Sequence, residues 1–330
     1  CPDYLLFIST DSMEKKKKVE SILDCLSILE IDYSDRNDRI IVPENSIPDI
    51  NEKIIEWVKH KRKEYDFTVN LTCGTKLMSI TAYEVFKGYD AEIIYLPLPQ
   101  NIYAPVNRPD NIAHVTARLP VEAYLAAYGV KISNQTTLEQ AEETALAKSD
   151  VTYFIYENYR ELRKLMKEIG DKVRSIKRNA VKKGVELTIP YNVTGQVESL
   201  FLQRTGFSQS KGLLKKVIDE KDWDYLRGGW LEDRIFIALK KIIPPESSDV
   251  RLKIKCRIRG NDNEFDVLFT FNNILYVVEC KSLDAPSGSD KGKMGGTIND
   301  FLYKLGALRQ NFGLTPRGIL AVSYTHLTLP

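Results

Sequence analysis

The chain is 330 residues long, with 43% hydrophobic and 28% charged residues, a composition that argues against disorder, collagen or coiled coil as a description of the whole. At about 150 residues per domain, the length suggests two domains. The 47 basic and 45 acidic residues leave a net charge of +2, which neither requires nor excludes a nucleic-acid partner. No apolar run approaches the roughly 20 residues that cross a bilayer, so no membrane contact is expected.

The five cysteines are scattered and form no CxxC pair, which argues against a disulfide framework or a zinc knuckle. Together with the lack of a signal peptide, this predicts a cytoplasmic protein. With only three histidines, a metal would depend on carboxylates, which favours Mg²⁺ or Mn²⁺ over Zn²⁺. The start lacks Met, and residues 323–330 have no helical or strand pattern; a foreign tail is one interpretation of them.

Short apolar runs alternate with helical patterns through the first part of the chain. Strands are expected at 4–8, 39–42, 67–71 and 91–96, and helices at 13–29, 47–63 and 77–86. This alternation predicts βαβ units and a mostly parallel sheet. After it come a loop rich in Pro and Asn at 97–109, a strand or hairpin at 111–119 and a short helix at 120–128.

The pattern from residue 136 to 183 is helical and heavily charged, and it changes again near Gly228. From there the sequence predicts helices at 230–243 and 297–312 and strands at 250–258, 264–271, 274–280 and 318–322. We therefore divide the chain into an N-terminal domain at 1–130, a mostly helical connector at 131–224 and a C-terminal α/β domain at 225–330.

Polar turns follow two of the N-terminal strands. The first strand ends in Ser9, Thr10 and Asp11, and the third leads through Thr72, Cys73, Gly74, Thr75 and Lys76 into a helix. In an open α/β sheet both turns would open at the edge where ligands bind, and the N–H groups of a helix N-terminus suit phosphate. The alternative is that these residues only cap helices. The chain has no GxGxxG motif and no P-loop, which disfavours dinucleotide or NTP binding.

The stretch 265–281 predicts a β-hairpin that carries three charged residues on one face. A two-residue turn at Asn272-Asn273 places Asp266 directly opposite Glu279, with their Cβ atoms about 5 Å apart. Lys281 lies two residues after Glu279 and shares its face. Two facing carboxylates repel, and a divalent cation between them would remove that repulsion.

Such a hairpin has the parts for phosphoryl transfer, in which a metal activates water and a lysine stabilises the developing charge. The alternative is an exposed hairpin that shows its polar face to solvent. A third acid, Glu232, shares a helix face with the apolar Phe236 and Leu239 and so leans toward the core. A carboxylate there needs a partner. The neighbouring Asp233 fits a first-turn acid that the helix dipole favours.

An acid on one strand followed by E-x-K on the next resembles the PD-(D/E)xK nuclease superfamily, with Asp266, Glu279 and Lys281 as the matching residues. Glu232 would be the helix acid of that superfamily. The resemblance implies a restriction-endonuclease-like fold and a catalytic set of Glu232, Asp266, Glu279 and Lys281. The metal, Mn²⁺ or Mg²⁺, would be held by Asp266, Glu279 and Glu232.

The two polar turns resemble those of a CARF domain, the Rossmann-like sensor of cyclic oligoadenylates in type III CRISPR defence. Many relatives carry Gly where Cys73 stands. The order of the two domains is similar to that of CARF-fused PD-(D/E)xK effector nucleases. The resemblance implies a homodimer with one cyclic oligoadenylate, most often the tetra-adenylate, across its two-fold axis. Binding would activate cleavage of RNA or DNA with little sequence preference.

Two other functions remain open at the level of sequence. One is a CARF-type transcription regulator with an idle C-terminal domain, which predicts sequence-specific DNA binding without a metal. The other is a restriction or repair nuclease that acts independently of a cyclic oligoadenylate. The sequence does not separate RNA from single-stranded or duplex DNA as substrate, does not decide whether the CARF domain degrades its activator, and gives residues 131–224 no motif.

Overall fold

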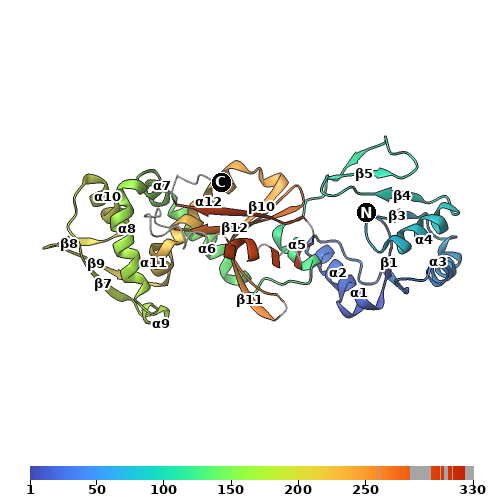
Figure 1. The fold of residues 1–330 in the computed structure, drawn as a ribbon, viewed down its shortest axis with the longest axis horizontal. Coiled ribbons are helices and arrows are strands. Elements are labelled where there is room, and N and C mark those ends of the chain that lie inside the picture. Colours follow the sequence, from blue (N-terminus) through green and yellow to red (C-terminus); the bar gives the residue numbers. More distant parts are fainter. Residues whose placement is uncertain (259, 283–298, 305, 308–310, 314, 324–330) are drawn as a thin grey trace. The chain divides into compact units, whose positions relative to one another are not determined.

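The computed structural model describes residues 1–258, 260–282, 299–304, 306–307, 311–313 and 315–323 (Figure 1). The chain divides into two compact units. The N-terminal unit comprises Cys1–Lys131, Glu246–Ser248 and Thr270–Leu275, and the C-terminal unit comprises Ile132–Pro245, Asp249–Phe269 and Tyr276–Pro330. None of the described helices is long and apolar enough to cross a membrane. The mixed α/β class predicted from the sequence is confirmed.

The N-terminal unit packs helices against short strands, of which two pairs are parallel and two antiparallel. Its elements are β1 Leu5–Ser9, α1 Asp11–Lys15, α2 Lys18–Ile28, β2 Asn37–Ile41, α3 Ile47–Lys61, β3 Thr68–Asn70, α4 Lys76–Lys87, β4 Glu92–Tyr95, β5 Ile102–Pro105, β6 Ala113–His114 and α5 Val121–Ala127. Strand β1 pairs in parallel with β2, and β3 pairs in parallel with β4. The apolar faces of α3 and α4 meet the strands in one core that includes the fully buried Ile50, Ile54 and Val58.

Two local predictions for this unit are wrong. The helix expected at 13–29 is broken into α1 and α2 because Lys17 has a left-handed backbone, with φ 52°. The stretch 97–109, expected to be a loop, contains β5, which extends the β3–β4 sheet as an antiparallel strand between β4 and β6. Its Pro and Asn residues lie mainly outside the strand, while the apolar Ile102 and Tyr103 are half-buried within it.

The C-terminal unit begins with helices α6 Gln135–Ala147, α7 Ser149–Glu157, α8 Tyr159–Arg174 and α9 Arg178–Val181. A three-stranded antiparallel sheet follows, in the order β7-β9-β8, made of β7 Val185–Pro190, β8 Ser208–Ser210 and β9 Leu213–Ile218, with α10 Gln196–Thr205 between β7 and β8. The sequence prediction of a mostly helical connector missed this sheet, although Leu187 and Ile189 are buried at alternating positions as a half-buried strand requires.

The second part of this unit is built on a four-stranded sheet in the order β10-β11-β12-β13. Its elements are α11 Glu220–Asp224, the π-helical turn η1 Tyr225–Gly229, α12 Trp230–Ile242, the short 3-10 turn η2 Pro245–Ser247, β10 Ser248–Ile258, β11 Asn261–Phe271, β12 Ile274–Lys281 and β13 Arg317–Val322. Strands β12 and β13 are parallel, with Lys281 opposite Val322. Residues 299–304 are helical, which agrees with part of the helix predicted at 297–312.

The β11–β12 connection is the two-residue turn that the sequence predicts. Asn272 and Asn273 both have positive φ, of 49° and 61°, as the favoured hairpin turn requires. The rings of Phe269 and Tyr276 stack at 4.5 Å between centroids, as expected for residues that face each other across such a turn. The tip of this hairpin belongs to the N-terminal unit, where the Asn273 side chain accepts a 2.9 Å hydrogen bond from the Leu119 N–H.

Candidate active site and ligand pocket

The carboxylates predicted from the hairpin come together in the C-terminal unit. Asp266 lies on β11, and Glu279 and Lys281 lie on β12. Asp266 Oδ2 accepts a 2.7 Å hydrogen bond from the backbone N–H of Cys280, so its carboxylate reaches across to the neighbouring strand. The Cys280 side chain is itself 8% exposed, which agrees with the apolar packing expected for it.

Glu279 is the most strongly paired acid of this group. Only 8% of the residue is exposed, and its two carboxylate oxygens lie 2.8 Å from Lys281 Nζ and 2.5 Å from Lys304 Nζ. Burial by itself raises the pKa of Glu279, but the hydrogen bonds and charges of the two lysines outweigh it and leave the pKa lowered. Glu279 is therefore held as an anion. The sequence analysis did not single out Lys304, although it lies in the helix predicted there.

The other two acids of the set, Asp266 and Glu232, have raised pKa values instead. Burial raises the pKa of Asp266, with a further contribution from the charge of Glu279, and the Cys280 N–H opposes the rise. Burial also raises the pKa of Glu232 to about 7; the charge of Lys253 opposes this rise, and those of Asp266 and Asp233 add to it. The charge of Asp266 is thus one of the causes that raise the pKa of Glu232.

A second lysine, Lys253 on β10, pairs with the helix acids, and the sequence analysis missed it. Its Nζ lies 3.5 Å from Glu232 and 3.7 Å from Asp233. Its backbone φ of 56° inside a strand is unusual for a residue other than glycine, and such irregularities re-aim side chains beside functional sites. Asp233 is 5% exposed and lies in the first turn of α12, as the sequence predicts. The half-buried ammonium group of Lys253 is a further partner, which tertiary packing supplies.

Two glycines shape the backbone where α12 begins. Gly228 has φ 132°, a conformation that side chains strongly disfavour, and a Cβ there would lie 3.3 Å from Ser282 Cβ. A Cβ on Gly229 would lie 2.7 Å from the Asp224 carbonyl oxygen. This close approach of backbone atoms sets the position of the first turn of α12, which carries Glu232.

The donor set of this cluster fits a hard divalent cation. Glu232, Asp266 and Glu279 offer only carboxylate oxygens, the ligands that Mg²⁺ and Mn²⁺ prefer. The pKa values of Glu232 and Asp266 are raised mainly by burial, with a further contribution from neighbouring acids, and a bound cation would lower both. Among the described residues the acids are not gathered into a ready-made group of three around one point; lysine ammonium groups pair with Glu232 and Glu279.

In the N-terminal unit, the first polar turn borders a pocket. A cavity of about 480 Å³ is lined by Thr10, Asp11, Ser12, Lys15, Lys16, Val42, Pro43 and Glu44. Thr10 also caps α1, because its hydroxyl accepts a 3.4 Å hydrogen bond from the Met13 N–H. Ser9 and Thr10 are buried, at 6% and 4% exposed. Capping and pocket lining, which the sequence analysis treated as alternatives, therefore occur together in this turn.

The second polar turn is organised mainly by hydrogen bonds to the backbone. Thr72 Oγ1 accepts from the Leu96 N–H at 2.8 Å, and Thr75 caps α4 by accepting from the Met78 N–H at 3.3 Å. The Thr75 hydroxyl also lies 3.5 Å from the carbonyl of Glu44, a residue of the pocket. Cys73, Gly74 and Lys76 are exposed. The turn thus adjoins the pocket through Thr75, and the residues that line the pocket come from elsewhere.

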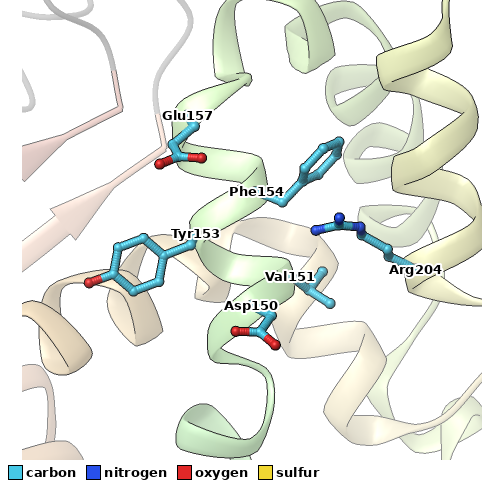
Figure 2. Close-up of a pocket in the computed structure, with 6 residues that line it drawn as sticks. All are labelled: Asp150, Val151, Tyr153, Phe154, Glu157 and Arg204. Carbon is cyan, nitrogen blue, oxygen red and sulfur yellow. The ribbon is translucent and has the colours of Figure 1, made fainter.

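A second hollow lies between α7 and α10 in the C-terminal unit. Figure 2 shows the six residues around this cavity of about 550 Å³: Asp150, Val151, Tyr153, Phe154, Glu157 and Arg204. The Arg204 guanidinium lies 4.3 Å from the centre of the Phe154 ring. The hollow carries charges of both signs, so it has no clear preference for an anionic or a cationic ligand.

Comparisons with known proteins assign both parts of the chain. Residues 1–124 match the Card1 CARF domain, and residues 219–326 match the Card1-like endonuclease domain. The stretch between the two matches belongs to neither. No curated protein matches the chain.

Solved structures with a similar fold cover almost the whole chain. Protein VC1899 from Vibrio cholerae aligns with a TM-score of 0.75 at 21% identity, over 98% of this chain and 83% of that one. Can2 from Sulfobacillus thermosulfidooxidans, in complex with cyclic tetra-adenylate, aligns with 0.72 at 17% identity, over 99% and 84%. A type III CRISPR defence DNA nuclease activated by cyclic oligoadenylate aligns with 0.57 at 16% identity, over 97% of this chain and 41% of that one.

Proposed function

Because the chain belongs to the Card1-like proteins, which join a CARF domain to an endonuclease domain, we propose that it is a nuclease of type III CRISPR defence that a cyclic oligoadenylate switches on. The observation that carries the proposal is the pairing of the two domain matches with the cluster of Asp266, Glu279 and Lys281 inside the second. A transcription regulator would need no such cluster. A cytoplasmic location fits a defence enzyme with five free thiols.

The activator is placed in the N-terminal unit. The pocket bordered by Thr10 and Asp11, with Lys15 and Lys16 beside it, offers hydroxyls and positive charge to a phosphodiester ring. Ser9, Thr72, Cys73, Gly74, Thr75 and Lys76 complete the proposed ligand set. Can2 is solved with cyclic tetra-adenylate, which makes that ring size the first to test. Two copies of this chain would share one ring across a two-fold axis, because a cyclic tetranucleotide is itself symmetric.

We assign the catalytic centre to Glu232, Asp266, Glu279 and Lys281. Glu232, Asp266 and Glu279 would hold Mn²⁺ or Mg²⁺, which when bound polarises the scissile phosphate and makes water a stronger nucleophile. Lys281 lies 2.8 Å from Glu279, so its ammonium group is fixed beside the carboxylates, where negative charge develops on the phosphate. Lys304 and Lys253 keep Glu279 and Glu232 oriented.

Activation requires the activator to favour the cutting state over the idle one. A ligand shifts such an equilibrium only as far as its affinities for the two states differ. Cleavage is therefore expected to rise with activator concentration and to saturate when the N-terminal pocket is filled. Nucleic acid is the substrate; whether RNA, single-stranded DNA or duplex DNA is preferred is a question for experiment.

The test is incubation of the purified chain with Mn²⁺, with and without cyclic tetra-adenylate, on labelled RNA, labelled single-stranded DNA and plasmid. We expect cleavage of at least one substrate that needs both the activator and the metal and that stops on addition of EDTA. Lys255→Ala serves as a control, since among the described residues the side chain of Lys255 on β10 makes only a long 3.9 Å ion pair with Glu264. Cleavage without activator would contradict the sensor role, and cleavage in EDTA would contradict the metal site.

A further inference from the structure

The segment that neither domain match covers carries an unusual concentration of positive charge. Residues 160–183 include ten basic and three acidic residues, whereas the whole chain is nearly neutral. Helix α8 buries one stripe, which includes Leu162, Leu165, Ile169 and Val173. The opposite side of α8 carries what we call the basic face: Arg160, Lys164, Lys167 and Arg174, all exposed. Their spacing of three, four and seven residues keeps them on one side of the helix.

Part of this charge is not used within the chain. Arg174 pairs with Asp171 on the same helix, but neither Arg160 nor Lys164 has an ion-pair partner among the described residues. Beyond α8, the exposed Lys177, Lys182 and Lys183 continue the run without a described partner. Exposed cations that serve no internal pairing are available to an anionic partner.

The N-terminal end of α8 lies at the edge of the candidate catalytic centre. The ring of Tyr159, its first residue, lies 5.1 Å from that of Trp230, which opens the helix carrying Glu232. The Tyr159 hydroxyl is 3.2 Å from Ser323 Oγ, and the Ser323 N–H donates to the carbonyl of Lys281 at 3.3 Å. Two hydrogen bonds therefore link the first residue of α8, next to Arg160 of the basic face, to Lys281.

From these observations we propose that the basic face of α8 is the substrate track, which binds the phosphate backbone of the nucleic acid and leads it to the catalytic centre. The helix has 16 residues and so extends for about 24 Å, long enough to contact several phosphates. Contacts to phosphate carry no sequence information, which fits a nuclease without sequence preference. This inference rests on the proposed function and adds to it the surface that receives the substrate.

The experiment compares two pairs of substitutions that change the net charge equally. The test variant is Arg160→Gln with Lys164→Gln. The control is Lys59→Gln with Lys63→Gln, two exposed lysines of the N-terminal unit without a described ion pair. Affinity for labelled RNA, single-stranded DNA and duplex DNA is measured in EDTA with cyclic tetra-adenylate, over a series of salt concentrations. Thermal melting verifies that both variants fold.

We expect the test variant to bind about ten-fold more weakly at 0.1 M salt, and its slope of log K against log salt to become shallower by about 1.4 to 1.8, as loss of two phosphate contacts requires. In cleavage assays with Mn²⁺, KM rises and kcat stays near its original value. The control keeps the original slope and KM.

Three outcomes would overturn the inference. If the original chain cuts nucleic acid and both variants bind it equally well, the track lies elsewhere and the proposed function stands. If the control loses as much affinity as the test variant, the effect is a general one of net charge. If the original chain neither binds nor cuts any of the three nucleic acids, the inference and the proposed function fail together.

Discussion

The two candidate sites satisfy their polar groups in different ways. In the N-terminal unit, side-chain hydroxyls satisfy backbone groups: those of Thr10, Thr72 and Thr75 accept hydrogen bonds from backbone N–H groups. In the C-terminal unit, carboxylates are held by lysines that come from other strands and helices. A hydroxyl that caps a helix is stable without a ligand, whereas buried acids are stable only while countercharge is present. Removal of single groups should therefore affect the two sites very unequally.

The largest effect is expected for Lys281. Lys281→Ala removes the ammonium group beside Glu279 and is expected to lower cleavage by at least about 10²-fold, the size typical for loss of one charge-stabilising donor. Since Lys281 is 41% exposed, the fold should survive its removal. The measurement is the single-turnover rate with saturating activator, together with activator affinity, which should not change.

Lys255→Ala is the matched control, because it also removes a lysine from the same sheet. Its rate should stay within about two-fold of the original, as surface ion pairs contribute little. A Lys281→Ala variant that still cuts at the control's rate would mean that the hairpin is not the catalytic centre.

The second effect concerns pH. Burial raises the pKa of Glu232 from 4.5 to about 7, so the folded protein binds a proton there that the unfolded chain has already lost. In the metal-free protein, the contribution of Glu232 therefore lowers the free energy of unfolding as pH rises from about 4.5 to about 7. Glu232→Gln should remove that loss, which is at most about 3 kcal/mol for a shift of this size.

Urea unfolding at pH 5 and pH 8 measures this effect as a difference between the original chain and the variant. Glu264→Gln is the control, because the Glu264 side chain is 56% exposed and should leave the pH dependence as it was. Equal pH dependence of the original chain and Glu232→Gln would show that Glu232 titrates normally. Glu279 acts in the opposite direction, since its lowered pKa adds stability that is lost as pH falls.

A third effect tests whether backbone packing positions the helix acid. In Gly229→Ala, the new Cβ would meet the Asp224 carbonyl oxygen at 2.7 Å, so the start of α12 must shift, at a cost of about 1 to 3 kcal/mol in unfolding free energy. Gly195→Ala is the control, because its Cβ would meet nothing within 4 Å. An equal loss of unfolding free energy in both variants would mean that the close approach at Gly229 does not cause the loss.

The difference between the sites also explains how far the sequence could lead. The hairpin was predictable because strand alternation and a two-residue turn fix which residues share a face, and the stacked Phe269 and Tyr276 follow the same rule. Lys253 and Lys304 were not predictable, since they approach the acids from another strand and another helix. Asp233 lies in the first turn of α12 as predicted, but its contact with Lys253 was not predictable, because tertiary packing sets it whereas the helix dipole is a local effect.

The smallest effect is expected in the N-terminal unit. Thr75→Ala removes the cap of α4, because the Met78 N–H loses its acceptor, and should lower the unfolding free energy by about 1 kcal/mol. Thr75→Ser keeps the hydroxyl and should restore most of this loss.

Since Thr75 also adjoins the pocket through Glu44, titration with cyclic tetra-adenylate separates its two roles. If capping is its only role, both variants bind the activator with the original affinity at a temperature where both are folded. If Thr75 is a ligand, Thr75→Ala alone binds it more weakly, and an unchanged affinity would remove this residue from the proposed ligand set.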